Sequence, residues 1–240
     1  MIGVVGPNEA AVRLAEAVQA ADVAVGDAVT FIDAGADLVV ASGDDAVQAL
    51  ATGGVDVPVL PVDTDAGLDP VDEAEAAAAV VRAVDGDVEV CTRPVVEIAI
   101  DGESVGRAVF EVMLVTSEPA RISEYAVRTG GGRDQYRADG VVIATAAGSH
   151  GYARAVGGPV LDPDAASLAV VPIAAFAIRS SSRVASADAT LTVSVERDEG
   201  DISLLVDGDI CREVPTRRPV TVRTADVVET VVPPGRLEKP

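Results

Sequence analysis

The chain has 240 residues, 49% of them apolar, which is enough for a sizeable core in one or two domains. No apolar run approaches the length needed to span a bilayer, and no basic flank with an apolar core follows Met1. Acidic residues outnumber basic ones 39 to 18, giving a formal charge of −21. We therefore expect a soluble cytoplasmic protein, with neither membrane nor nucleic acid as a partner.

The acidic residues are spread along the chain among apolar ones, whereas acidic tails form blocks. Lys239 is the only lysine. One interpretation is an acidic partner-binding protein. The interpretation we favour is a halophilic protein from a high-salt cytoplasm, where screening makes the self-repulsion tolerable, and it predicts poor folding at low salt.

Cysteine and histidine give little material for metal or nucleophilic chemistry. Cys91 and Cys211 lack a metal-type spacing, and His150 is the only histidine. We expect two reduced thiols, no protein-held metal site and no histidine-based triad.

The first third of the chain alternates strand and helix patterns. Strands are expected at 2–5, 38–41 and 57–62, and helices at 9–21 (with Asn8 as N-cap), 46–51 and 73–84. The expected buried faces are Ala11, Leu14, Ala15 and Val18 on the first helix and Ala77, Val80, Val81 and Val84 on the last. This alternation predicts a parallel sheet covered by helices.

From about residue 88 the hydrophobic period changes to two, which indicates strands. Strands are expected around 96–100, 109–115, 140–144, 169–172, 191–195, 202–206 and 220–223. Asp101-Gly102 and Asp207-Gly208 are hairpin turns by composition. The predicted fold is therefore an α/β domain (1–86) plus a β-rich domain (87–240), the last residues returning to the first domain as an option.

Gly130-Gly131-Gly132 suggests a mobile connection, with a phosphate-handling lid as the alternative. Arginines cluster on either side of it. These are Arg121, Arg128, Arg133, Arg137, Arg179 and Arg183. They either attract a phosphate-rich ligand or pair with surface carboxylates, and the sequence does not decide between the two.

The first candidate site is the turn from Ala41 to Ala46, which follows a buried strand and opens a helix. Gly43, Asp45 and Ala46 would offer backbone N–H groups to phosphate oxygens, and Asp44 could act as a general base on a hydroxyl. An ordinary strand-to-helix turn with an acidic cap has the same composition.

The second candidate is the stretch 138–152, in which a buried strand runs into small residues and then Tyr152. Such a loop lets a ligand lie against backbone, with Tyr152 as a wall. Alternatively, the glycines make turns, and His150 and Tyr152 are surface residues.

Together the two stretches resemble the ATP/polyphosphate–NAD kinase family, and the pattern fits a divergent haloarchaeal type. That family carries a G-G-D-G-T turn, an N-E pair, a D-G stretch ending T-P-T-G-S-T-A-Y, then G-G-P and a D-G-Q turn. The matching segments here are 42–46, Phe110-Glu111, Asp139 to Tyr152, 157–159 and Asp207-Gly208.

The resemblance implies transfer of a phosphoryl group from ATP or polyphosphate to the 2′-hydroxyl of the adenosine ribose of NAD, with Mg²⁺, in a homo-oligomer. It makes Asp44 the base. It assigns NAD binding to Phe110, Glu111, Asp139, Ser149, His150, Gly151, Tyr152 and Asp207. Phosphoryl transfer needs mainly positioning and charge neutralisation, which suits these groups.

Several positions depart from the family pattern. Ser42, Asp45 and Ala46 replace two glycines and a threonine, Phe110 replaces the asparagine, and His150 stands where a threonine is usual. The alternative function is therefore a catalytically impaired paralogue that binds a nucleotide or dinucleotide as a regulatory or partner subunit.

Overall fold

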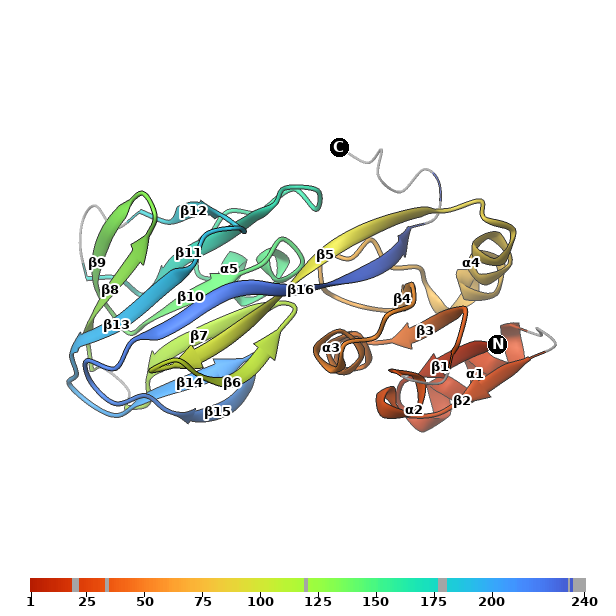
Figure 1. The fold of residues 1–240 in the computed structure, drawn as a ribbon, viewed down its shortest axis with the longest axis horizontal. Helices are drawn as coiled ribbons and strands as arrows, with labels where there is room; N and C mark the ends of the chain where they lie inside the picture. Colours follow the sequence, from red (N-terminus) through yellow and green to blue (C-terminus); the bar gives the residue numbers. More distant parts are fainter. Residues whose placement is uncertain (19–21, 33–34, 119–120, 177–180, 233, 235–240) are drawn as a thin grey trace. The chain divides into compact units, whose positions relative to one another are not determined.

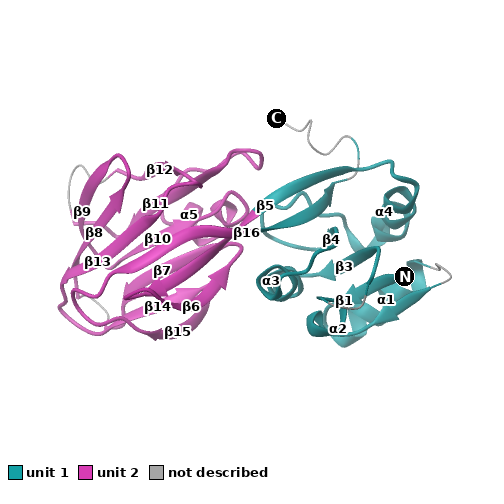
Figure 2. Cartoon of the chain, in the orientation of Figure 1, with its two compact units in different colours: residues 1–93, 227–240 teal, residues 94–226 magenta. Residues whose placement is uncertain are grey.

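The computed structural model describes residues 1–240 except 19–21, 33–34, 119–120, 177–180, 233 and 235–240 (Figure 1). The chain divides into two compact units, residues 1–93 with 227–240 and residues 94–226 (Figure 2). The sequence placed the boundary between residues 86 and 87. In the structure the first unit extends to Arg93 and also includes the chain from Val227 onward. Strands β5 (Glu89–Ile100) and β16 (Val220–Val232) contribute residues to both units.

The first unit is an α/β structure built on a parallel sheet. Its elements are β1 Ile2–Val5, α1 Asn8–Val18, β2 Val23–Val25, α2 Ala28–Ile32, β3 Leu38–Ser42, α3 Asp44–Gly53, β4 Val59–Val62 and α4 Glu73–Asp85. The strand order is β2-β1-β3-β4, and β16 lies parallel beside β4. The predicted parallel sheet with helices is confirmed, while β2 and α2 were too short for the sequence pattern to indicate.

Helices cover the sheet in two pairs, α1 with α4 and α2 with α3. Ile2 and Val4 pack in one apolar cluster with residues of α1 and α4. Gly3, whose position points to the opposite face, meets α2, since a Cβ there would lie 2.8 Å from the Phe31 ring. The alternation along one short strand therefore assigns each helix pair to its face.

The predicted buried face of α4 is confirmed at Val80 and wrong at Val81 and Val84. Val81 and Val84 are 56% and 66% exposed, whereas Ala76, Ala79 and Val80 are buried. An alanine-rich helix offers two overlapping i, i+3, i+4 stripes, and the stripe of smaller side chains allows the closer approach to the core. The α1 face is confirmed at Ala11, Leu14 and Val18.

The second unit is β-rich, as predicted. Its further strands are β6 Glu103–Ala108, β7 Glu111–Thr116, β8 Ser123–Thr129, β9 Gly132–Ala138, β10 Gly140–Ala144, β11 Ser167–Ile173, β12 Arg183–Ser186, β13 Leu191–Arg197, β14 Ile202–Val206 and β15 Asp209–Glu213. One antiparallel sheet has the order β12-β11-β10-β7-β14-β15. The other strands extend from β16 through β13 and β8 to β9. On the other side, β5 pairs with β16, and β6 pairs with β5. Side chains of both layers share one apolar core.

The sequence predicted both Asp-Gly hairpin turns correctly but misjudged the triple glycine. Asp101 and Gly102 have φ of 52° and 86°, and Asp207 and Gly208 have φ of 47° and 91°. Positive φ at both central residues is the geometry that matches strand twist in two-residue hairpins. The triple glycine is not a mobile loop or lid: Thr129 pairs with Gly132, so residues 130 and 131 form a tight β8–β9 turn.

The sheet with the order β12-β11-β10-β7-β14-β15 has one face in the shared core. Segment 145–161 covers its other face. This segment contains a 3₁₀ turn (Gly148–His150) and the short helix α5 (Tyr152–Ala155). Ala146, Ala153 and Leu161 pack there against Val142 and Ala144 of β10. The small-residue stretch thus lies against the sheet, at the end of β10.

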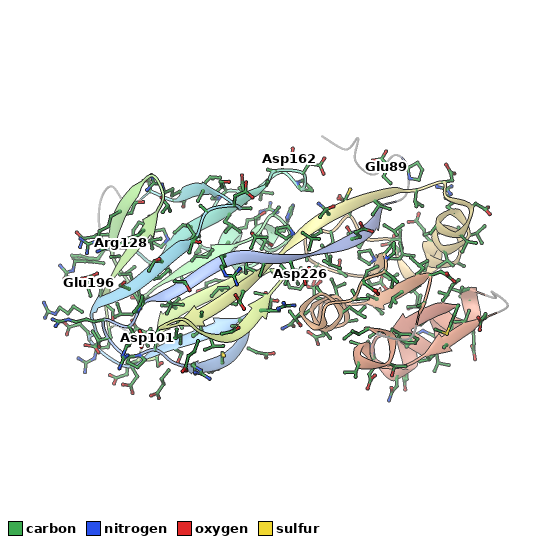
Figure 3. All side chains as sticks on the ribbon, viewed as in Figure 1. Glu89, Asp101, Arg128, Asp162, Glu196 and Asp226 are labelled. Atoms are coloured by element: carbon green, nitrogen blue, oxygen red, sulfur yellow. The ribbon has the colours of Figure 1, made fainter. Side chains whose placement is uncertain are left out.

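Acidic side chains are distributed over both units. Examples from strands and from the loops between elements are Glu89, Asp101, Asp162, Glu196 and Asp226 (Figure 3). Cys91 is buried and Cys211 is exposed. Among the described residues, none of the helices has the length and apolar character to cross a membrane.

Candidate functional site

The first group of site residues lies in the first unit, at the carboxyl end of the parallel sheet. Buried β3 ends at Ser42, and α3 begins at Asp44. Gly43 between them has φ 83°, and no heavy atom lies within 4 Å of where its Cβ would be. Among the described residues, no side-chain cap bonds the first N–H groups of α3, and uncapped N–H groups at a helix start suit an anion.

The Asp44 carboxylate is half-buried beside this turn. Its Oδ1 accepts the N–H of Ala66 at 3.4 Å. Burial raises the pKa of Asp44, the N–H groups of Ala66 and Asp65 oppose that rise, and the charges of Asp65 and Asp45 add to it. A carboxylate with a raised pKa is a better proton acceptor, as a general base requires.

Three positions of the turn differ from the quoted pattern. Asp45 is exposed to solvent, which screens its charge. Ser42 and Ala46 are buried, at 8% and 5% exposed. The turn therefore offers backbone N–H groups, and Ala46 adds no hydroxyl where the pattern has a threonine.

The second group lies in the second unit and centres on the bend at Phe110-Glu111. Asp207 Oδ2 accepts the N–H of Val109 at 2.9 Å, and Oδ1 accepts those of Phe110 and Glu111 at 2.9 and 2.8 Å. The Asp207 N–H donates to the Glu111 carbonyl at 2.9 Å. Asp207 thus holds backbone with both carboxylate oxygens, and burial raises its pKa.

Thr145 holds the same bend from the other side. Its hydroxyl donates to the Val109 carbonyl at 2.6 Å, and its N–H donates to the Phe110 carbonyl at 2.9 Å. Gly148 packs so closely that a Cβ there would lie 2.0 Å from the Phe110 oxygen. The backbone around Phe110 is therefore fixed by contacts that do not use its side chain.

Glu111 is the most strongly perturbed carboxylate of this group. It is 9% exposed, and its Oε2 accepts the N–H of Ala153 at 3.3 Å. Burial raises the pKa of Glu111 to about 7, with the Ala153 N–H opposing and Asp207 adding to the rise. At neutral pH the carboxyl group can both donate and accept hydrogen bonds.

The small-residue stretch supplies the remaining members. Ser149 is fully buried, donating to the Ala146 carbonyl at 2.7 Å and accepting the Leu161 N–H at 2.9 Å. The Nδ1 of His150 is buried without a hydrogen-bond partner among the described residues. The position of a Cβ on Gly151 lies 3.9 Å from Glu111 Oε2, and Tyr152 is 43% exposed.

Asp139 is not brought together with these residues. Asp139 precedes β10, whereas Thr145 follows that strand. The Asp139 carbonyl accepts the Thr116 N–H and the Asp139 N–H donates to the Ile173 carbonyl, both at the start of β10. A five-residue strand spans about 16 Å. Asp139 and Glu111 therefore belong to opposite ends of the same sheet.

Four members of the arginine cluster pair with carboxylates. Pairs are Arg121 with Glu118, Arg133 with Glu196, Arg137 with Glu124 and Arg183 with Asp134. Arg179 lies outside the described residues. These contacts favour the surface-pairing interpretation over a phosphate site.

Comparison with known proteins identifies the family. The sequence profile described as the ATP-NAD kinase C-terminal domain matches residues 109–233, just over half of the chain. The chain belongs to the ATP-NAD kinase family. A curated relative, an NAD kinase of Methanospirillum hungatei, is 28% identical over 72% of this chain and 65% of its own length. The match thus covers slightly less than two thirds of that relative.

Two solved family structures share the fold. A yeast NADH kinase complexed with NADH has a TM-score of 0.81 and 15% identity, with 96% of this chain and 82% of that chain covered. An Archaeoglobus fulgidus NAD kinase in complex with ATP has a TM-score of 0.77 and 22% identity, with 98% and 94% covered. The α/β unit followed by a β-rich unit is therefore the fold of this family.

Sequence reasoning missed two residues that organise the site. Thr145 was part of the quoted pattern but not assigned a role, although a hydroxyl after a buried strand is a common backbone anchor. Ala66 contributes only its N–H to Asp44. No side-chain pattern reveals a backbone donor that comes from another loop.

Proposed function

We propose that this chain transfers a phosphoryl group from ATP or polyphosphate to the 2′-hydroxyl of the adenosine ribose of NAD, forming NADP. The observation that carries the proposal is the half-buried Asp44 carboxylate at the uncapped start of α3, in a chain of the ATP-NAD kinase family. The ATP and NADH in the titles of the two family structures support the ligand classes.

In this mechanism, the 2′-oxygen attacks the terminal phosphorus of the donor while Asp44 takes the hydroxyl proton. The bond from that phosphorus to the leaving oxygen breaks, and ADP or the shortened polyphosphate departs. The N–H groups at the start of α3, at Asp44, Asp45 and Ala46, and the open space at Gly43 receive phosphate oxygens. The chemistry needs positioning and one proton acceptor, which this turn supplies.

The second unit binds the dinucleotide. Glu111 hydrogen-bonds a ribose hydroxyl, His150 offers its unpartnered Nδ1, and Tyr152 presents an exposed ring beside Gly151. Asp207 and Ser149 act through the backbone that they hold. The assignments of Phe110 and Asp139 to NAD binding stay predictions, the latter separated from Glu111 by the length of β10.

Mg²⁺ fits the donor chemistry of the first group. Mg²⁺ takes oxygen ligands and keeps waters and substrate phosphates, so one or two carboxylates suffice. Asp45, exposed on the turn, would hold it together with donor phosphates and waters, and when bound it would neutralise phosphate charge.

The setting that we propose for this activity is a halophilic, cytoplasmic homo-oligomer. The charge of −21 and the dispersed carboxylates support the high-salt assignment. The exposed edge strand β15, with Ile210 75% exposed, supports self-association through the second unit.

A binding protein without phosphoryl transfer is the second candidate. Ala46 is buried without a hydroxyl, and Phe110 lacks an amide, so two polar groups of the family pattern are missing. Purified protein with NAD, Mg²⁺ and either ATP or polyphosphate in concentrated KCl separates the two. NADP formation supports the kinase, and NAD binding without product supports the binding protein. A protein that neither binds NAD nor forms NADP would reject both candidates.

A further inference from the structure

A buried ion pair lies in the first unit, outside the residues assigned above. Arg93 is the last residue of the 1–93 segment of that unit, and its side chain is fully buried. Its Nη2 lies 3.2 Å from Asp69 Oδ2, and its Nε donates to Thr230 Oγ1 at 3.2 Å. The Thr230 hydroxyl donates in turn to the Cys91 carbonyl at 3.3 Å. The guanidinium thus joins β5 and β16 to a loop that follows β4.

That loop, residues 63–69, is conformationally constrained at both ends. Asp63 and Asp69 have φ of 49° and 52°, in the left-handed region that non-glycine residues rarely adopt. Such conformations cost free energy and persist only where surrounding contacts impose them. Asp69 receives such a contact from Arg93, and Asp63 accepts the Glu73 N–H at 3.1 Å.

The middle of the loop contacts the candidate base. The Leu68 N–H donates to the Ala66 carbonyl at 2.8 Å, and Leu68 itself is fully buried. The Ala66 N–H donates to Asp44 Oδ1. Arg93 is therefore connected to Asp44 through its ion pair with Asp69, the adjoining Leu68, the Leu68–Ala66 hydrogen bond and the Ala66–Asp44 hydrogen bond.

We propose that Arg93 is a positioning residue for Asp44: its ion pair with Asp69 fixes the 63–69 loop so that the Ala66 N–H orients the Asp44 carboxylate. The inference rests on the proposed function for its catalytic consequence only. Its structural content, the dependence of the Ala66–Asp44 contact on Arg93, is independent of the reaction.

Arg93→Met tests the inference without leaving a buried charge. The substitution keeps an unbranched stem and removes the guanidinium, while Asp69, 25% exposed, stays solvated. Asp69→Asn is the second variant, which keeps the size of the side chain, and serves if Arg93→Met does not fold. Arg82→Met is the control, because it removes another arginine of the same unit, on the exposed face of α4.

Two readouts do not need activity. We expect faster amide exchange at Ala66 in Arg93→Met and Asp69→Asn, and an NMR-titrated pKa of Asp44 that is higher than in the wild type, because the opposing N–H is loosened. Arg82→Met should change neither. Unchanged Ala66 exchange and an unchanged Asp44 titration in a folded Arg93 or Asp69 variant would overturn the inference.

Steady-state kinetics test whether the positioning role of Arg93 affects catalysis. We expect kcat to fall about tenfold in Arg93→Met with little change in the KM for NAD, because small displacements of a catalytic group act on the chemical step. A rise in KM at constant kcat would contradict a positioning role. A wild-type protein that forms no NADP would reject the proposed function, while the exchange and titration results would still decide the inference.

Discussion

Both carboxylate oxygens of Asp207 accept hydrogen bonds from the backbone that carries Glu111, at 2.8 to 2.9 Å. The Asp207 N–H returns a bond to the Glu111 carbonyl. A hairpin turn of one strand pair thus sets the position of a buried carboxyl group on a neighbouring strand. The family pattern suggests Asp207 as a ligand contact, but its carboxylate oxygens bond the backbone around Glu111.

Asp207→Ala tests this relationship. Three backbone N–H groups would lose their acceptor, so we expect the free energy of unfolding to fall by about 3 kcal/mol. Denaturant unfolding measures the change. Asp209→Ala, two residues further along and exposed, is the control and should be nearly neutral. Equal stabilities of the two variants would show that the Asp207 contacts do not hold the bend.

Glu111 predicts a pH dependence of stability. Its pKa is about 7 in the folded protein and near 4.5 in the unfolded chain, so between these values the folded state binds more protons. Stability therefore falls as pH rises through this window, by about 3 kcal/mol from this group. Unfolding measured from below pH 4.5 to above pH 7 should show this loss.

Glu111→Gln isolates the contribution, because it removes the titration and keeps Asp207, whose raised pKa acts in the same direction. We expect the wild type to lose stability relative to this variant as pH rises. A constant difference between the two proteins across the window would mean that Glu111 titrates normally.

Gly148→Ala should be strongly destabilising. A Cβ there would lie 2.0 Å from the Phe110 carbonyl oxygen, so the 3₁₀ turn or the bend must move, at a cost of about 3 kcal/mol. Thermal unfolding measures it. Gly130→Ala is the control, because nothing lies within 4 Å of that position, and its midpoint should stay near the wild type.

Much of the fold could be predicted from sequence because local patterns carry it. The helix at Asn8–Val18, strand β10 and both Asp-Gly hairpins follow from periodicity and turn chemistry. The α4 face could not be chosen, since its alanine and valine stripes overlap. The triple glycine was misjudged because a tight turn and a mobile loop have the same composition.

The site was less predictable for a physical reason. Asp44 and Glu111 could be named from their motifs, but the contacts that tune them are long-range and made by backbone. Ala66 reaches Asp44 from 22 residues away, and Ala153 reaches Glu111 from 42. Arg93 offered one signal, a charge inside an otherwise apolar strand pattern, and its partner Asp69 offered none.

Salt should stabilise this protein. With a charge of −21, mutual repulsion of dispersed carboxylates opposes folding, and the screening length falls from about 10 Å at 0.1 M salt to about 3 Å at 1 M. We expect the thermal midpoint to rise over that range of KCl. A midpoint indifferent to KCl would contradict the high-salt assignment.

The most direct test is NADP formation from NAD and ATP or polyphosphate by wild-type protein, Asp44→Asn and Asp56→Asn in concentrated KCl. Asp56 is the matched control, since it is an exposed aspartate of the same unit and is not assigned to the site. We expect product with the wild type and Asp56→Asn, and a loss of at least about 100-fold with Asp44→Asn. Full activity of Asp44→Asn would contradict this expectation.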